Sequence, residues 1–200
     1  MRSADILISL TLAMQFGYAQ VYFPPGVLAR TPQASEVAAN QCSIFLKSLH
    51  EPSLWELAQH DPSAEAYRLL WLQEFDRPAS VRFVRKPGGT GWFYRRMTGG
   101  RGGAKPGRMT EYGMSWFWKS RTSSFLSTVE SLGFWNLPTL CDADGNAIRG
   151  CPAHWIVEGI KNGQYHVVDR CSPEQTDPVR AIGMLAMKLG NLRVHRSDLY

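Results

Sequence analysis

Apolar and polar residues alternate most clearly in two pairs of segments, and each pair predicts a β-hairpin. "SVRFVRK" alternates apolar and basic residues over 80–86, and after the turn "PGGTG" the segment "WFYRRM" forms a returning strand over 91–97. A period of two is typical of a strand with one buried face. Strands over 153–160 and 164–171 flank Asn162-Gly163, which favours a two-residue type I′ turn because both positions need positive φ.

This turn fixes the register of the second hairpin. With a two-residue loop, His154 faces Cys171, and every other pair follows by counting back from the turn. The polar side chains then gather on one face of the sheet: His154, Glu158, Tyr165, Asp169 and Cys171. The other face carries Trp155, Val157 and Val168.

Helical periodicity predicts helices near 35–60, 123–133 and 178–189. In the first range the apolar positions near helical spacing are Val37, Ile44, Phe45 and Leu49, with Cys42 alongside. Ser53 followed by Glu56 is a capping box, so a second, shorter helix begins there. Ser123 and Asp177 are the N-cap candidates of the later helices. "EAYRLLWLQEF" fits a helix or a buried strand equally, and "YGMSWFWKS" is a further strand candidate.

These elements predict one α+β domain: an antiparallel sheet of four or more strands with helices packed on one side. A chain of 200 residues with 44% hydrophobic content suits a single core, so we expect one domain over 20–200. "TGGRGGAKPGRM" is rich in glycine and poor in apolar residues, and predicts a mobile surface loop over about 98–108.

Residues 1–19 are typical of a secretory signal peptide. Arg2 begins a short positive region, an apolar run follows over 6–14, and Gly17-Tyr18-Ala19 places small residues at the two positions that a signal peptidase reads. The apolar run is shorter than the roughly 20 residues that span a bilayer. We therefore expect export to the periplasm or the exterior, without a transmembrane anchor.

Four cysteines in an exported protein favour disulfides. Four cysteines allow three pairings. Cys141 and Cys151 flank the turn-rich stretch "DADGNAIRG", so we expect these two to pair, which leaves Cys42 with Cys171.

The polar face of the hairpin contains the residue types of a hydrolase. A thiol becomes a nucleophile when an imidazole takes its proton and a carboxylate orients that imidazole, as Cys171, His154 and Glu158 or Asp169 would allow. The two carboxylates would also suit a glycosidase acting on cell-wall glycan. Against the thiol mechanism, an oxidising compartment favours a disulfide at Cys171.

Metal sites and cofactor motifs receive little support from the sequence. Asp142, Asp144 and Asn146 alternate as in a calcium loop, but Gly145 and Ala153 do not fit the positions at which an EF-hand requires glycine and glutamate. The histidines are scattered and no Cys-x-x-Cys pair occurs, so we expect neither a metal nor a cofactor.

"FWNLPT" followed by "HWIVEGIKNGQYHVVDRCSPE" resembles a family of exported bacterial proteins for which no activity is established. The resemblance covers roughly residues 51–189 and is strongest over 134–173. It implies export and a compact α+β domain. Cys171 stands where those proteins usually carry Trp, which argues against a catalytic thiol.

Basic residues are concentrated between residues 82 and 121, in a chain whose net charge is +5. The anion-binding candidates are Arg82, Arg85, Arg95, Arg96, Arg101, Lys105 and Arg108. Trp92, Phe93 and Tyr94 lie among them, a mixture that suits single-stranded nucleic acid, although export favours a lipid head group, an envelope polymer or an acidic protein. A solvated basic face with no ligand is the simplest alternative. We favour an exported, non-enzymatic binding protein over a hydrolase that uses the hairpin.

Overall fold

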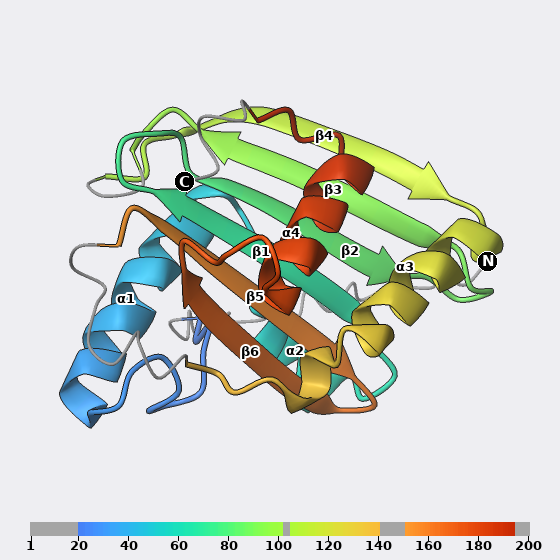
Figure 1. Ribbon diagram of the computed structural model, residues 1–200, viewed down its shortest axis with the longest axis horizontal. Coiled ribbons are helices and arrows are strands. Elements are labelled where there is room, and N and C mark those ends of the chain that lie inside the picture. The colour runs from blue at the N-terminus through green and yellow to red at the C-terminus, as the bar shows by residue number, and fades with distance from the viewer. Residues whose placement is uncertain (1–19, 102–104, 141–150, 195–200) are drawn as a thin grey trace, which may run out of the picture.

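A six-stranded antiparallel sheet forms the centre of the fold, in the order β4-β3-β2-β1-β5-β6 (Figure 1). The computed structural model describes residues 20–101, 105–140 and 151–194. The strands are β1 (Ala66–Gln73), β2 (Ala79–Arg85), β3 (Gly91–Thr98), β4 (Met109–Phe117), β5 (Ala153–Lys161) and β6 (Gln164–Cys171). The α+β class and the antiparallel sheet are therefore confirmed. The predicted signal peptide lies outside the described residues.

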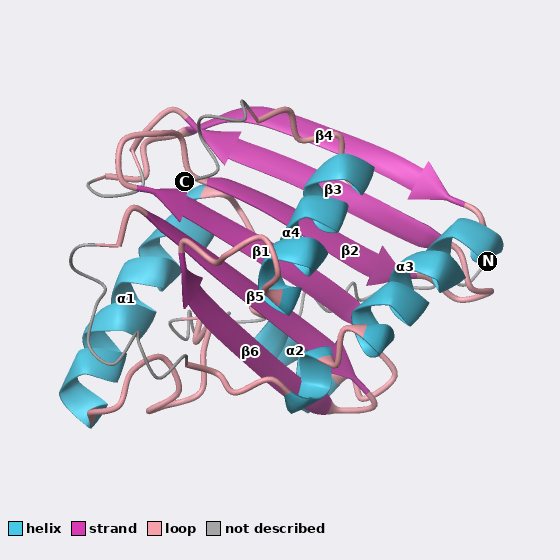
Figure 2. Cartoon of the chain, in the orientation of Figure 1, coloured by secondary structure: helices cyan, strands magenta, loops and turns pink. Residues whose placement is uncertain are grey.

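Helices cover both faces of this sheet, whereas the sequence predicted helices on one side (Figure 2). Helices α3 (Lys119–Ser131) and α4 (Pro178–Leu189) pack on one face, and α1 (Pro32–Ser48) and α2 (Leu54–His60) on the other. The reason lies in β1, the ambiguous segment, whose eight residues are all buried. A strand that is buried on both faces needs cover on both. In the described residues no helix is long and apolar enough to cross a membrane.

The core beneath α3 and α4 is built around aromatic rings. Trp71 and Trp155 lie on neighbouring strands, with ring centroids 6.0 Å apart in an edge-on arrangement. Helix α4 crosses Trp155 at Gly183, where an added Cβ would lie 2.7 Å from the indole ring. The short helix η1 (Phe134–Asn136) contributes Phe134 to the same core.

Helix α1 faces the sheet with only part of the set predicted. Phe45 and Cys42 are buried together with Ser35, Ala38 and Leu46, and Leu49 just after the helix is buried as well, whereas Val37 and Ile44 are exposed. Positions 38, 42, 45 and 46 form one helical stripe. Val37 and Ile44 are seven residues apart on another side of the helix, so their hydrophobicity does not indicate burial.

Local sequence signals place most of the element boundaries. The turn at Asn162-Gly163 has φ of 53° and 73°, and the predicted hairpin register is confirmed from His154–Cys171 to Lys161–Gln164. Ser53 and Asp177 accept the capping hydrogen bonds of α2 and α4. The cap predicted at Ser123 is wrong, because α3 begins earlier, after Trp118, without a side-chain cap.

The disulfide joins Cys151 to Cys171, so the predicted pairing is wrong. The β5–β6 register carries the end of β6 back to the residues that precede β5, and the two Cα atoms lie 5.5 Å apart. Cys42 is a free thiol on the buried side of α1. Cys141 and the loop "DADGNAIRG", with its calcium candidates, lie outside the described residues.

Replacing both Cys151 and Cys171 by Ala should lower the free energy of unfolding by about 3 kcal/mol, because the bond closes a loop with a sequence separation of 20. Urea unfolding of the oxidised protein and the double variant measures the difference. Disulfide mapping should find Cys151 linked to Cys171, and Cys42 should be alkylated only after unfolding. Linkage of either hairpin cysteine to Cys42 would contradict this assignment.

Candidate functional site

The polar hairpin face that suggested a hydrolase lacks the predicted free thiol and the predicted pair of accessible carboxylates. Cys171 is bonded to Cys151 and has no thiol to ionise. His154 Nδ1 lies 3.1 Å from Asp169 Oδ1, near that disulfide, whereas Glu158 is completely buried further along β5. The sequence correctly placed these side chains on one face. Their surroundings leave neither a nucleophile nor a carboxylate pair that a substrate reaches.

Glu158 belongs instead to a buried ion pair that links the neighbouring strands β1 and β5. Arg68 on β1 lies directly opposite Glu158 on β5 and donates from Nε to its carboxylate at 2.7 Å. Both side chains have no exposed surface. Tyr165 on β6 donates its hydroxyl to the other carboxylate oxygen at 2.9 Å. Burial raises the pKa of the Glu158 carboxyl, although Arg68 and Tyr165 favour its charged form.

Glu51, in the connection between α1 and α2, receives three guanidinium groups. Arg82 donates to one carboxylate oxygen at 2.7 Å and Arg96 to the other at 2.9 Å, while Arg68 lies 3.7 Å away. Burial alone would raise the pKa of the Glu51 carboxyl, but these three cations outweigh burial and lower its pKa. Glu51 is therefore a charged anchor that ties the helical layer to the sheet.

The predicted anion-binding residues do not form one basic surface. Four of the seven have partners within the fold: Arg82 and Arg96 bind Glu51, Arg85 binds Glu65, and Arg95 donates to the carbonyl of Asn191. Arg95 and Arg96, neighbours on β3, point to opposite faces of the sheet. The other three, Arg101, Lys105 and Arg108, are exposed at the β3–β4 loop and have no ion-pair partner among the described residues.

Beyond the part of the sheet that α1 and α2 cover, strands β3 and β4 present a second candidate surface. The register places six side chains on the side of β3 and β4 that no described helix covers, a surface that we call the open face: Trp92, Tyr94, Arg96, Tyr112, Met114 and Trp116. Tyr112, Met114 and Trp116 are 53%, 50% and 41% exposed. The guanidinium group of Arg82 lies 4.6 Å from the ring centroid of Tyr94, and that of Arg96 lies 5.7 Å from Tyr112.

Sequence reasoning identified only part of this surface. It noted Trp92 and Tyr94, but the β4 residues were assigned no role. The available signal is the alternation in "YGMSWF", where large residues at 112, 114 and 116 share one face and smaller residues at 113 and 115 the other. Alternation predicts a common face but does not tell whether a helix covers it.

Cations lie at both ends of the open face. Arg101, Lys105 and Arg108 lie at the end where β3 leads into β4, and Lys86 and Lys119 lie near the opposite end. The only carboxylate that we find beneath the face in the described chain is Glu51, which is buried and neutralised. The open face is therefore aromatic at its centre and has cations near both ends, with the Asp61 carboxylate also near the Lys86 end.

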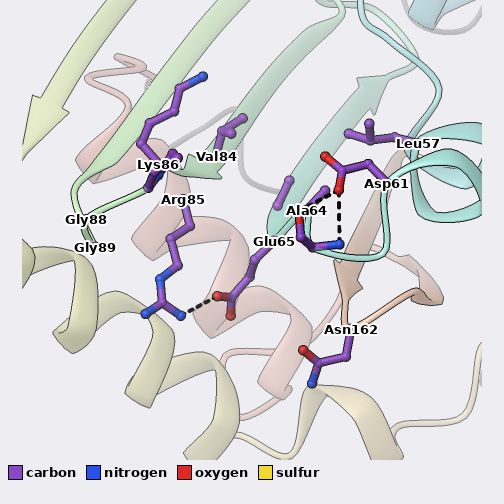
Figure 3. Close-up of a pocket in the computed structure, with 13 residues that line it drawn as sticks. Leu57, Asp61, Ala64, Glu65, Val84, Arg85, Lys86, Gly88, Gly89 and Asn162 are labelled. Carbon is purple, nitrogen blue, oxygen red and sulfur yellow. Dashed lines mark hydrogen bonds and ion pairs between the residues drawn. The ribbon is translucent and has the colours of Figure 1, made fainter.

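A hollow of about 590 Å³ lies near the Lys86 end, between the end of α2 and the β2–β3 turn (Figure 3). Leu57 and Val84 line its apolar part, and Asp61 contributes a carboxylate. Arg85 and Glu65 are paired with each other at its wall, at 2.6 Å. Val84 lies opposite Trp92, so the hollow adjoins the aromatic part of the open face.

Comparison with other proteins does not identify the chain: no protein-family model matches it, and no curated protein is significantly similar to it. Within the described ranges, no group of three His, Cys, Asp or Glu side chains could hold a metal ion.

Replacing Glu158 by Gln should lower the free energy of unfolding by about 3–5 kcal/mol, because the neutral amide removes the carboxylate to which the buried Arg68 donates and leaves that charge with Glu51 alone, 3.7 Å away. Urea unfolding at pH 7 measures this. Glu111→Gln is the matched control: it removes a carboxylate from the half-exposed pair with Arg77, and should cost less than about 1 kcal/mol. An equal loss of unfolding free energy in the two variants would show that the buried pair contributes no more to stability than the half-exposed pair.

The charge of Glu51 should make stability depend on pH in the acid range. Its pKa is lowered in the folded protein, so its contribution is present above about 4.5, the ordinary value, and is lost as the pH falls through the lowered pKa. The stability difference between wild type and Glu51→Gln should therefore shrink between about pH 5 and pH 2. Unfolding curves across this range measure it. A difference that stays constant with pH would contradict the assignment.

Proposed function

We propose that this protein is an exported, non-enzymatic binding protein that holds an acidic polysaccharide of the cell envelope on its open face. The observation that carries the proposal is an uncovered aromatic sheet surface with cations at both ends. The proposal of export rests on the sequence of residues 1–19, and the Cys151–Cys171 disulfide is compatible with an oxidising compartment.

The aromatic centre suits the flat, apolar faces of sugar rings. Such faces gain dispersion contacts and lose unfavourable hydration when they pack on an aromatic ring. Trp92 and Tyr94 have ring centroids 6.5 Å apart and planes inclined by only 20°. Trp116 lies opposite Trp92 on the neighbouring strand, so the rings form a platform wider than one side chain.

The positive ends favour a polymer over a single anionic group. A strand of nine residues such as β4 extends over about 30 Å, and the cations lie near its two ends. One lipid head group is too small to contact both ends at once. A polysaccharide with acidic groups along its length can place sugars on the rings and carboxylates beside Arg101, Arg108 and Lys119.

Replacing Trp92 by Ala should weaken binding of polygalacturonate about tenfold, because one stacking platform is lost, at a cost of about 1.4 kcal/mol. Isothermal titration calorimetry on the purified protein measures the affinity. The double substitution Arg101→Gln and Arg108→Gln should weaken binding mainly at low salt, because salt screens these exposed charges.

Two matched controls lie away from the open face. Phe75→Ala removes an exposed aromatic ring from the β1–β2 connection, and Arg193→Gln removes an exposed cation after α4. Both should leave the affinity unchanged. Equal binding of neutral dextran, or binding of anionic vesicles with no binding of polygalacturonate, would overturn the assignment of an acidic polysaccharide.

A further inference from the structure

The two edges of the sheet differ. Along β6 the outer side is occupied, because Asp169 donates its main-chain N–H to the carbonyl of Thr139 at 2.8 Å. The guanidinium group of Arg170 donates to the carbonyls of Thr139 and Pro138 at 3.1 and 2.9 Å. The chain that follows η1 thus covers this edge.

The β4 edge is bare in the described chain. Thr98 donates its N–H toward β2, and Gly99 donates its N–H to Arg108 on the β4 side. The main-chain N–H and C=O groups of successive residues point toward opposite neighbouring strands. The odd-numbered residues of β3 therefore direct these groups toward β4. Gly113 lies opposite Arg95 and is therefore turned toward β3. The main-chain groups that face outward from β4 are those of Tyr112, Met114 and Trp116, and no described residue hydrogen-bonds to them.

This edge lacks the features that usually prevent edge-to-edge pairing. Proteins protect edge strands by shortness, proline, lysine, bulges or a covering segment. Strand β4 has nine residues, with no proline and no basic residue among them, and its bulge lies at the Met97–Thr98 end. The residues whose main-chain groups face outward are Tyr112, Met114 and Trp116, and their side chains, on the open face, are of types enriched in protein interfaces.

We infer that β4 is a homodimer interface, at which a second copy of this chain pairs antiparallel to β4 and extends the sheet. Self-pairing about a twofold axis is compatible with the sequence of β4. Two registers bring the outward main-chain groups of the two copies together near the middle of β4. In these registers Glu111, the one residue of β4 that is charged at pH 7, would face Ser115 or Phe117 of the second copy. No like charges would oppose each other, and Tyr112 would face Met114 or Trp116 across the axis.

The dimer would also join two open faces, since Tyr112, Met114 and Trp116 belong to both surfaces. The inference goes beyond the proposed function and does not depend on it. Self-association needs no polysaccharide, so a failure of the binding experiment would not count against the dimer. A failure of the dimer experiment would likewise not count against polysaccharide binding.

Sedimentation velocity of the purified full chain, from about 1 µM to about 500 µM without ligand, tests the inference. We expect a dimer at the upper end of this range, with slow amide exchange at Tyr112, Met114 and Trp116 that becomes fast on dilution. Met114→Pro should give a folded monomer, because proline removes an outward N–H that β3 does not use. Met114→Lys should weaken the dimer at least tenfold while leaving that N–H in place.

Met184→Lys is the matched control, because Met184 is an exposed methionine on α4, and it should leave the dimer intact. A wild type that stays monomeric at the highest concentration would overturn the inference, as would a dimer that persists in both Met114 variants with full affinity. If removal of residues 195–200 converts a monomer into a dimer, the chain's own C-terminus occupies β4, and the inference is equally overturned.

Discussion

The buried pair between Arg68 and Glu158 is the interaction on which the rest of the structure depends. A guanidinium group in the middle of a central strand must be compensated, and one carboxylate does not satisfy all its donors. Arg68 therefore also donates to the carbonyl of Pro52 and attracts Glu51. Both belong to the connection between α1 and α2, so this ion pair determines where the helical layer sits on the sheet.

The position of that layer explains the open face. Glu51 extends the contacts of the helical layer as far as Arg82 and Arg96, and beyond them no described segment covers this side of β3 and β4. The same contacts change the meaning of the basic segment. Arg82 and Arg96 neutralise a buried carboxylate and hold their guanidinium groups over tyrosine rings, so they stabilise the platform more than they attract an anion. Charge counted along a sequence overstates the charge that a surface presents.

Features that depend on near neighbours in the sequence were predictable, and features that join distant segments were not. The β5–β6 register followed from Asn162-Gly163 because a two-residue turn determines every pair. The pair of Arg68 with Glu158 spans 90 positions, and no local pattern indicates the partner. The predicted pairing of Cys141 with Cys151 is wrong because the β5–β6 register, and not closeness in sequence, brings Cys171 beside Cys151. For the open face, alternation along β3 and β4 indicates which side chains share a side of the sheet, but it does not indicate that no described helix covers that side.

The hairpin and the open face differ in how their side chains are held. Polar residues on the hairpin are held by partners that burial makes obligatory, and a group held this firmly does not exchange its partner for a substrate. Exposed aromatic side chains on β4 have the opposite character: they satisfy no buried donor and add nothing to the core. Their exposure carries a solubility cost that a monomer with no partner would not retain without benefit. The physical case for our proposal therefore rests on the β3–β4 end of the sheet, whereas the described contacts of Glu158 and Tyr165 on the hairpin hold neighbouring strands together.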